Sequence, residues 1–235
     1  PETLILAYPI SSEVKAKRLE KIIKIFPETK FYTIISNTFH FNLVKDIVNL
    51  DGIYIDLDTG MNRTGISKEN IPNLIDYISS NNYKKLKGIH AYDGQTYGIV
   101  SVEDRVINTQ KTLKDIREVE KKIKEKLSVD DFEIIVGGSW SFHFYIEEKD
   151  IKLSPGTWIY WDISNIKQKE LPFQIAGVVL GQVIDQNNSN DTVTIDIGAK
   201  AVSSDPPTEN RLRLIDKPNA KFILALRHPM DTILS

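Results

Sequence analysis

The amino-acid sequence contains no cysteine, which excludes disulfide bonds and zinc sites built from thiolates. It has no apolar run close to the roughly 20 residues of a membrane-spanning helix. No secretory signal peptide is visible, and a formal net charge of −2 offers no electrostatic footprint for nucleic acid or an anionic membrane. These absences predict a cytoplasmic protein without nucleic-acid or membrane partners.

Methionine is also scarce, and the chain does not begin with it. The first residue is Pro1, and the only methionines are Met61 and Met230. An apolar run starts at Leu4, and a strand that begins so abruptly indicates that something upstream has been removed. Loss of an initiator methionine is the alternative. The 235 residues are enough to bury one large core or two modest ones.

Short β-rich apolar runs alternate with helical patterns through the first two thirds of the chain. Several runs are continuously apolar, which is typical of strands buried on both faces. The predicted strands span residues 4–10, 30–35, 52–57, 86–92, 132–136 and 157–161. The predicted helices span residues 13–25, 41–50, 71–78 and 102–127.

Repetition of a strand followed by a helix implies parallel strands with crossover helices, in either an open sheet or a barrel. A (β/α)8 barrel needs eight strands, and the sequence offers six candidates. A barrel that lacks its first one or two units fits both this count and the abrupt start. The expected fold class is therefore α/β, with an incomplete TIM-like barrel over residues 1–161.

From about residue 162 the pattern changes to apolar runs joined by polar turns, without a convincing helix between them. The candidate strands there span residues 175–184, 191–195, 211–215 and 221–226. This pattern predicts a second, antiparallel β domain over residues 162–235.

Arg63 follows the predicted strand 52–57, within the segment 58–65, Asp-Thr-Gly-Met-Asn-Arg-Thr-Gly. In a barrel, the carboxyl ends of the strands carry the active site. An arginine there is a fixed cation that can hydrogen-bond a phenolate or a carboxylate. An ordinary loop with a surface arginine is the competing interpretation.

Two turns of small residues follow later strands. Gly137, Gly138 and Ser139 come directly after the strand 132–136, and Ser154-Pro155-Gly156-Thr157 forms a similar turn further on. Glycines allow the backbone to approach a ligand closely, and exposed N–H groups at a helix start suit a phosphate. Two such turns fit the usual phosphate position of these barrels, after their last two strands. Gly-Gly turns are also common without any ligand.

His90 and Tyr92 lie two residues apart near the end of the predicted strand 86–92, so both side chains point to the same side. At a barrel mouth they could contact a flat heterocycle, although a strand histidine is more often structural. His40 and His143 show no partner pattern and are read as structural. His228, followed by Pro229, Met230 and Asp231, is a candidate metal ligand or a plain loop histidine.

Taken together, these residues resemble one family. Residues 58–65 look like the corresponding segment of alanine racemases and related fold-type III pyridoxal-phosphate enzymes. Further stretches resemble the branch that contains D-threonine aldolases and D-serine dehydratases. They span residues 88–94, 137–139, 153–162 and 193–205, in the order found in the family. The resemblance covers most of the chain.

The resemblance implies roles for individual residues. Arg63 would lie beside the ring of pyridoxal 5′-phosphate, with His90 and Tyr92 at its face or edge. Four residues of the small-residue turns would hold the phosphate: Gly138, Ser139, Gly156 and Thr157. Arg63 and His90 would take part in catalysis. The resemblance also implies a homodimer in which both domains shape the site.

The sequence departs from the family at two points. The family's Schiff-base lysine lies near the end of the first barrel strand, upstream of this chain, and Lys200 does not replace it. The family's metal is bound by a histidine and a Cys or Asp two residues later. Here Met230, a poor ligand, stands at that spacing from His228, and Asp231 follows one position later. A divalent zinc, manganese or magnesium ion is therefore a possible second cofactor with one named ligand, His228.

The function that follows is a lyase acting on D-3-hydroxy amino acids, either an aldolase or a dehydratase. Aldol cleavage breaks the Cα–Cβ bond, whereas dehydration removes the Cα proton and expels the 3-hydroxyl group. A racemase of the same fold is the first alternative, although no second acid/base residue can be identified for it. A degenerate, non-catalytic homologue is the second, because the expected lysine is absent.

Overall fold

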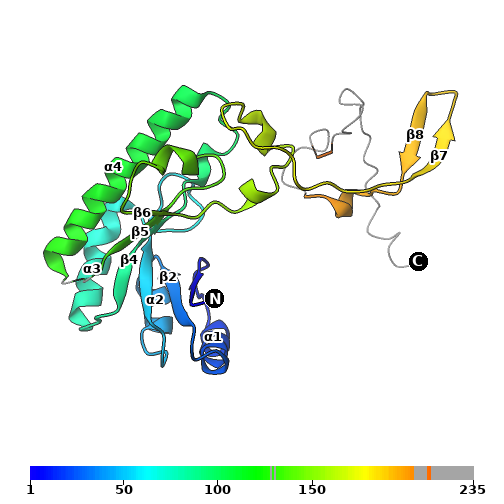
Figure 1. Cartoon of the computed structure of the whole chain (residues 1–235). Coiled ribbons are helices and arrows are strands. Elements are labelled where there is room, and N and C mark those ends of the chain that lie inside the picture. Colours follow the sequence, from blue (N-terminus) through cyan, green and yellow to red (C-terminus); the bar gives the residue numbers. More distant parts are fainter. Residues whose placement is uncertain (128, 130, 204–210, 213–235) are drawn as a thin grey trace. The chain divides into compact units, whose positions relative to one another are not determined.

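The computed structural model describes residues 1–127, 129, 131–203 and 211–212 (Figure 1). The chain divides into two compact units, Pro1–Gly156 and a second that starts at Thr157. The boundary expected from the sequence lies between residues 161 and 162. Within the described residues, no helix has both the length and the apolar character needed to cross a membrane.

The first unit is built on six parallel strands that are hydrogen-bonded in sequence order. They are β1 (Thr3–Leu6), β2 (Lys30–Ile35), β3 (Gly52–Asp56), β4 (Leu86–Ala91), β5 (Glu133–Val136) and β6 (Ile151–Leu153). The helices between them are α1 (Glu13–Ile25), α2 (Thr38–Val44), α3 (Ile71–Ser80) and α4 (Val102–Lys126) (Figure 1). The predicted alternation of parallel strands and crossover helices is therefore present.

The helices begin where the sequence offers capping side chains. Ser12 accepts a hydrogen bond from the backbone of Lys15 at the start of α1, and Ser101 accepts one from Asp104 at the start of α4. In α4, buried residues recur every three or four positions, as an amphipathic helix requires: Thr109, Thr112, Ile116, Val119 and Ile123.

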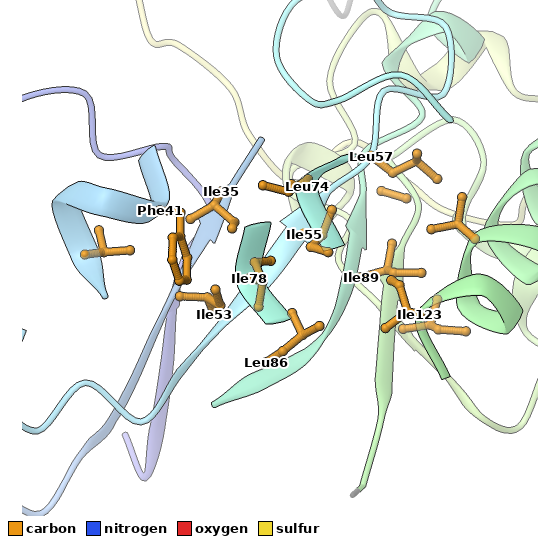
Figure 2. Packing of buried hydrophobic residues seen from close by; sticks show 14 of the residues in the cluster. Ile35, Phe41, Ile53, Ile55, Leu57, Leu74, Ile78, Leu86, Ile89 and Ile123 are labelled. Atoms are coloured by element: carbon orange, nitrogen blue, oxygen red, sulfur yellow. The ribbon is translucent and has the colours of Figure 1, made fainter. Parts of the chain in front are cut away.

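The main core lies on one face of the sheet. Alternate strand residues such as Ile53, Ile55 and Ile89 pack there against the helices, for example against Phe41 and Ile123 (Figure 2). The opposite face carries a separate small cluster of three residues, Ile34, Tyr54 and Ile135. A doubly wound sheet has helices on both faces, whereas helices on one face are typical of a barrel wall. The sheet is therefore an arc of an α/β barrel, and within the described residues β1 and β6 are its edges.

The predicted sixth strand was wrong. Residues 157–159 form a 3₁₀ helix, and the sixth strand is β6, which pairs with β5 between Ile134 and Ile151. β6 has only three residues, and only Ile151 among them is buried. It therefore lacks the continuous apolar run from which the other strands could be predicted. The apolar residues Ile159 and Tyr160, which suggested a strand, are exposed.

In the second unit, β7 (Val183–Asn187) and β8 (Thr192–Ile195) form an antiparallel hairpin. The strand predicted over 191–195 is present, but the one predicted over 175–184 begins only at Val183. The polar residues 185–187 belong to β7, and the turn lies at residues 188–191. The predicted strand 221–226, and all but the first two residues of 211–215, lie outside the described residues.

Candidate functional site

The segment that carries Arg63 is a tightly closed loop after β3. The Asp58 carboxylate accepts hydrogen bonds from the backbone N–H groups of Gly60 (2.9 Å) and Asn62 (3.1 Å). The ends of the loop are joined because Ile66 N donates to Asp56 O (2.8 Å) and Asp58 N donates to Ile66 O (3.0 Å). The backbone of the loop that carries Arg63 is therefore held by hydrogen bonds within the loop itself.

Glycine is needed at position 65 to close this loop. Gly65 has φ +103°, and a Cβ built there would lie 2.5 Å from the backbone nitrogen of Asp58. Any other residue would push the two ends of the loop apart. The glycine in the family-like segment thus has a local structural reason.

Arg63, Tyr92 and Gly138 are brought together at the carboxyl ends of β3, β4 and β5. The guanidinium carbon of Arg63 lies 5.2 Å from the centroid of the Tyr92 ring, within cation–π range. A Cβ added to Gly138 would lie 3.0 Å from Cε2 of the same ring. Three residues that the sequence singled out in separate segments therefore form one continuous surface.

Thr59 and Gln95 tie the Arg63 loop to the turn after β4. The Gln95 amide donates to the backbone oxygen of Thr59 (3.0 Å), and the Thr59 hydroxyl donates to Tyr92 O (3.3 Å). A Cβ at Gly94 would overlap the sulfur of Met61, so the two segments are also in close contact. These links fix the position of the Arg63 loop relative to Tyr92.

His90 lies on β4 and is paired with a carboxylate on the neighbouring strand. Its Nδ1 is 2.7 Å from Oδ1 of Asp56, and the side chains are only 10% and 4% exposed. The pair follows from strand register, which sets Asp56 opposite His90. Oδ2 of Asp56 has no hydrogen-bond partner among the described residues. A buried, half-satisfied carboxylate is costly, so this pair is a candidate for function.

The glycine turn after β5 is held by hydrogen bonds to side chains of neighbouring segments. Gly137 has φ +95°, which favours glycine, and its carbonyl oxygen accepts from the Ser154 hydroxyl (3.4 Å). That contact links the turn to the second small-residue turn, which begins at Ser154. The N–H of Gly138 donates to Oδ1 of Asp93 (2.9 Å) and to the hydroxyl of Ser141 (2.9 Å). It is therefore already engaged within the protein, and a phosphate would meet other groups of the turn.

Gly156, Thr157 and His228 are also predicted site residues, whereas Lys200 is assigned no role from the sequence. Gly156 ends the first unit, and a Cβ built there would meet no atom within 4 Å. Thr157 begins the second unit and the 3₁₀ helix 157–159. Lys200 lies in the short 3₁₀ helix Ala199–Ala201 of the second unit. The metal candidate His228 lies outside the described residues, as do Met230 and Asp231. Among the residues that the structure describes, no group of three or more His, Asp or Glu side chains could hold a metal ion.

Sequence reasoning did not single out Asp56, Asp93 or Gln95. Asp56 did carry a signal, because a carboxylate within the apolar strand Ile-Tyr-Ile-Asp-Leu has to find a partner. Asp93 and Gln95 lie next to Tyr92, but their partners are on distant segments. Nothing local in the sequence indicates that Asp93 is completely buried.

No protein-family model matches the chain, and neither does any curated protein sequence. Solved structures do match. D-threonine aldolase from Filomicrobium marinum superposes with a TM-score of 0.73 at 13% identity, over 86% of this chain and 56% of that one. An alanine racemase-like protein from Idiomarina loihiensis superposes with a TM-score of 0.75 at 19% identity, over 89% of this chain and 56% of that one. D-threo-3-hydroxyaspartate dehydratase from Delftia sp. superposes with a TM-score of 0.72 at 14% identity, over 89% of this chain and 56% of that one.

These likenesses establish the fold. The resemblance to fold-type III pyridoxal-phosphate enzymes, inferred from the residues, is confirmed at this level, and the partial barrel followed by a β unit agrees with it. The chain spans a little over half of the length of these proteins.

Proposed function

We propose that this chain, which has the fold of fold-type III pyridoxal-phosphate enzymes, provides most of a cofactor site in a lyase that acts on D-3-hydroxy amino acids. The observation that carries the proposal is the contact of Arg63, Tyr92 and Gly138 at the carboxyl ends of three adjacent strands. Two of the matched structures are a D-threonine aldolase and a D-threo-3-hydroxyaspartate dehydratase, which supports aldol cleavage or dehydration as the reaction.

The residues of this surface fit pyridoxal phosphate. A half-buried aromatic ring with an arginine over its face offers a flat apolar wall beside a cation. Because Gly138 has no side chain, the turn after β5 lies close to the same ring. When bound, pyridoxal phosphate supplies an electron sink for charge that develops at Cα of an amino acid. We assign no lysine of this chain to a covalent bond with it.

The residues of the chain would act as follows. Arg63 hydrogen-bonds an anionic oxygen of the cofactor or of the substrate. Asp56 accepts a hydrogen bond from the Nδ1–H group of His90. Nε2 of the same imidazole is then available to take a proton from the substrate or to give one to it. His90 and Asp56 are both buried, so water has little access to this proton. Gly138, Ser139, Gly156 and Thr157 remain our candidates for holding the phosphate.

We further propose a homodimer and a divalent metal ion, either zinc, manganese or magnesium, that assists departure or activation of the 3-hydroxyl group. Its only proposed ligand is His228. A racemase is the second candidate, and the likeness to an alanine racemase-like protein favours it. A racemase would need no metal but would need a second proton-transferring residue on the other side of the substrate.

Product analysis separates these reactions. We expect the protein, supplied with pyridoxal phosphate and D-threonine, to release glycine and acetaldehyde if it is an aldolase or 2-oxobutanoate if it is a dehydratase. Formation of L-allo-threonine alone would identify a racemase and overturn the lyase proposal. Full activity in the presence of a chelator would overturn the metal, and absence of every product would support a non-catalytic homologue.

Arg63 provides a test of the cofactor surface that does not depend on turnover. The probe is pyridoxine 5′-phosphate, whose alcohol in place of the aldehyde prevents covalent bonds to lysines. We expect Arg63→Leu to weaken its binding by about tenfold or more, because a charge-assisted hydrogen bond contributes roughly 1.5–3 kcal/mol. The control is Arg18→Leu, which removes an exposed arginine of α1. Equal dissociation constants for both variants, measured by calorimetry, would count against the proposed ring position.

A further inference from the structure

The carboxylate of Asp93 is completely buried directly after β4. Its Oδ1 accepts hydrogen bonds from Gly138 N (2.9 Å) and the Ser141 hydroxyl (2.6 Å). Its Oδ2 accepts from the Tyr145 hydroxyl (2.8 Å). Both oxygens of a side chain that has no access to solvent are therefore satisfied.

All three donors lie on the segment that follows β5. A single carboxylate on the turn after β4 therefore fastens the glycine turn and the 3₁₀ helix Phe142–Tyr145 to the end of the neighbouring strand. The Ser141 hydroxyl adds to this arrangement, because it also accepts from Gly138 N (2.9 Å). The turn is consequently held by side chains as well as by its own backbone.

The position of Asp93 relates this fastening to the proposed site. Tyr92, its neighbour in sequence, has its ring against Gly138, and the backbone oxygen of Tyr92 accepts from Thr59 of the Arg63 loop. Asp93 is fully buried, and of the three residues Arg63, Tyr92 and Gly138 only Gly138 donates a hydrogen bond to its carboxylate. It can influence that surface only through the groups that it holds.

Such an arrangement is costly to build. Burial raises the pKa of the Asp93 carboxyl, although the hydrogen bonds from Ser141, Tyr145 and Gly138 each lower it. A buried carboxylate with three donors is much harder to accommodate than the apolar side chain that could fill the same volume. The unfavourable burial of this carboxylate has a reason if the shape of the turn is needed for function.

We propose that Asp93 is a positioning residue, which holds the turn at Gly137 and Gly138 against the Tyr92 ring in the shape that receives the phosphate of the cofactor. This inference rests on the proposed function. It assigns the N–H of Gly138 to the internal support of the turn and leaves the phosphate to other groups of the same turn. Asp93 acts on the cofactor only through the turn.

The first measurement concerns the turn alone, in the protein without cofactor. Asp93→Ala removes one of the two acceptors of Gly138 N and an acceptor of the Ser141 hydroxyl, which is the other. We therefore expect hydrogen exchange at the Gly138 amide, followed by NMR, to become at least about tenfold faster. Asp93→Asn keeps an oxygen for Gly138 and Ser141 and offers an N–H to the Tyr145 oxygen. It should restore slow exchange. Unchanged exchange in Asp93→Ala would overturn the proposal.

The second measurement concerns the phosphate. The affinities of pyridoxine 5′-phosphate and of pyridoxine are compared, since only the first carries the phosphate. We expect Asp93→Ala to reduce the ratio of the two affinities by about tenfold, through weaker phosphate binding, and Asp93→Asn to keep it within about threefold of the original. A ratio that Asp93→Ala leaves unchanged would overturn the role in phosphate binding.

A matched control separates positioning from general stability. Tyr54→Phe removes a different part-buried hydrogen bond, from the Tyr54 hydroxyl to Glu133 (2.7 Å). It is expected to lower Tm without changing the affinity ratio, and a matching fall in this ratio would overturn the specific role of Asp93. If the unaltered protein binds both probes equally, the phosphate site of the proposed function fails. The exchange measurement still decides whether Asp93 holds the turn.

Discussion

Gly88→Ala is expected to lower the free energy of unfolding of the first unit by about 3 kcal/mol or more, because overpacking against backbone leaves little room for adjustment. Gly88 lies in β4, between β3 and β5, and pairs with Glu133. A Cβ at this position would overlap the carbonyl oxygen of Glu133 and lie 2.7 Å from its carbonyl carbon. The added methyl group would therefore force β4 and β5 apart.

The consequence reaches the site. His90 and Asp93 follow Gly88 on the same strand and turn, and the glycine turn at Gly138 follows β5. Separation of the two strands would strain the contacts that join them. Urea denaturation measures the loss of stability. The matched control is Gly156→Ala, where a Cβ meets no atom, and stability there should stay within about 0.5 kcal/mol. Equal stabilities of the two variants would contradict the close approach of β4 and β5.

His90→Leu is expected to destabilise the protein by about 3–5 kcal/mol, the range for a buried pair that loses one partner. His90 is the partner of Oδ1 of Asp56, and Oδ2 has none among the described residues. Without the imidazole, the buried carboxyl group of Asp56 would lose the partner of its Oδ1, and a buried polar group without a partner is destabilising. The measurement is the free energy of unfolding at neutral pH.

The double variant His90→Leu/Asp56→Asn tests this cause. Asparagine removes the charge at almost the same volume, so the double variant should regain most of the stability lost in His90→Leu. If both variants are equally unstable, the loss comes from packing around position 90 and not from an unpaired carboxylate. The same pair provides the proton-carrying Nε2 in the proposed reaction, so this outcome also bears on function.

Local patterns in the sequence were sufficient to predict most strands and helices of the first unit. β2, β3 and β5 are mostly apolar, because most of their residues are buried on both faces of the sheet. Such segments can be recognised in the sequence without knowing what covers them. α1 and α4 carry their own capping serines and buried residues at helical spacing. β6 escaped prediction because it is defined by its pairing with β5 and has little apolar character of its own.

The sequence by itself predicted parallel strands with crossover helices, and it singled out Arg63, Tyr92 and the glycine turns. Only the tertiary structure decided how they are supported. Asp56 and His90 are 34 residues apart, and Asp93 is 45 residues from Gly138 and 52 from Tyr145. Parallel strands are joined by long crossover connections, so residues that meet at one sheet edge are far apart in the chain and share no local pattern. Strand register brings them together, and the carboxylates of Asp56 and Asp93, which hydrogen-bond residues of the proposed site, were not singled out from the sequence.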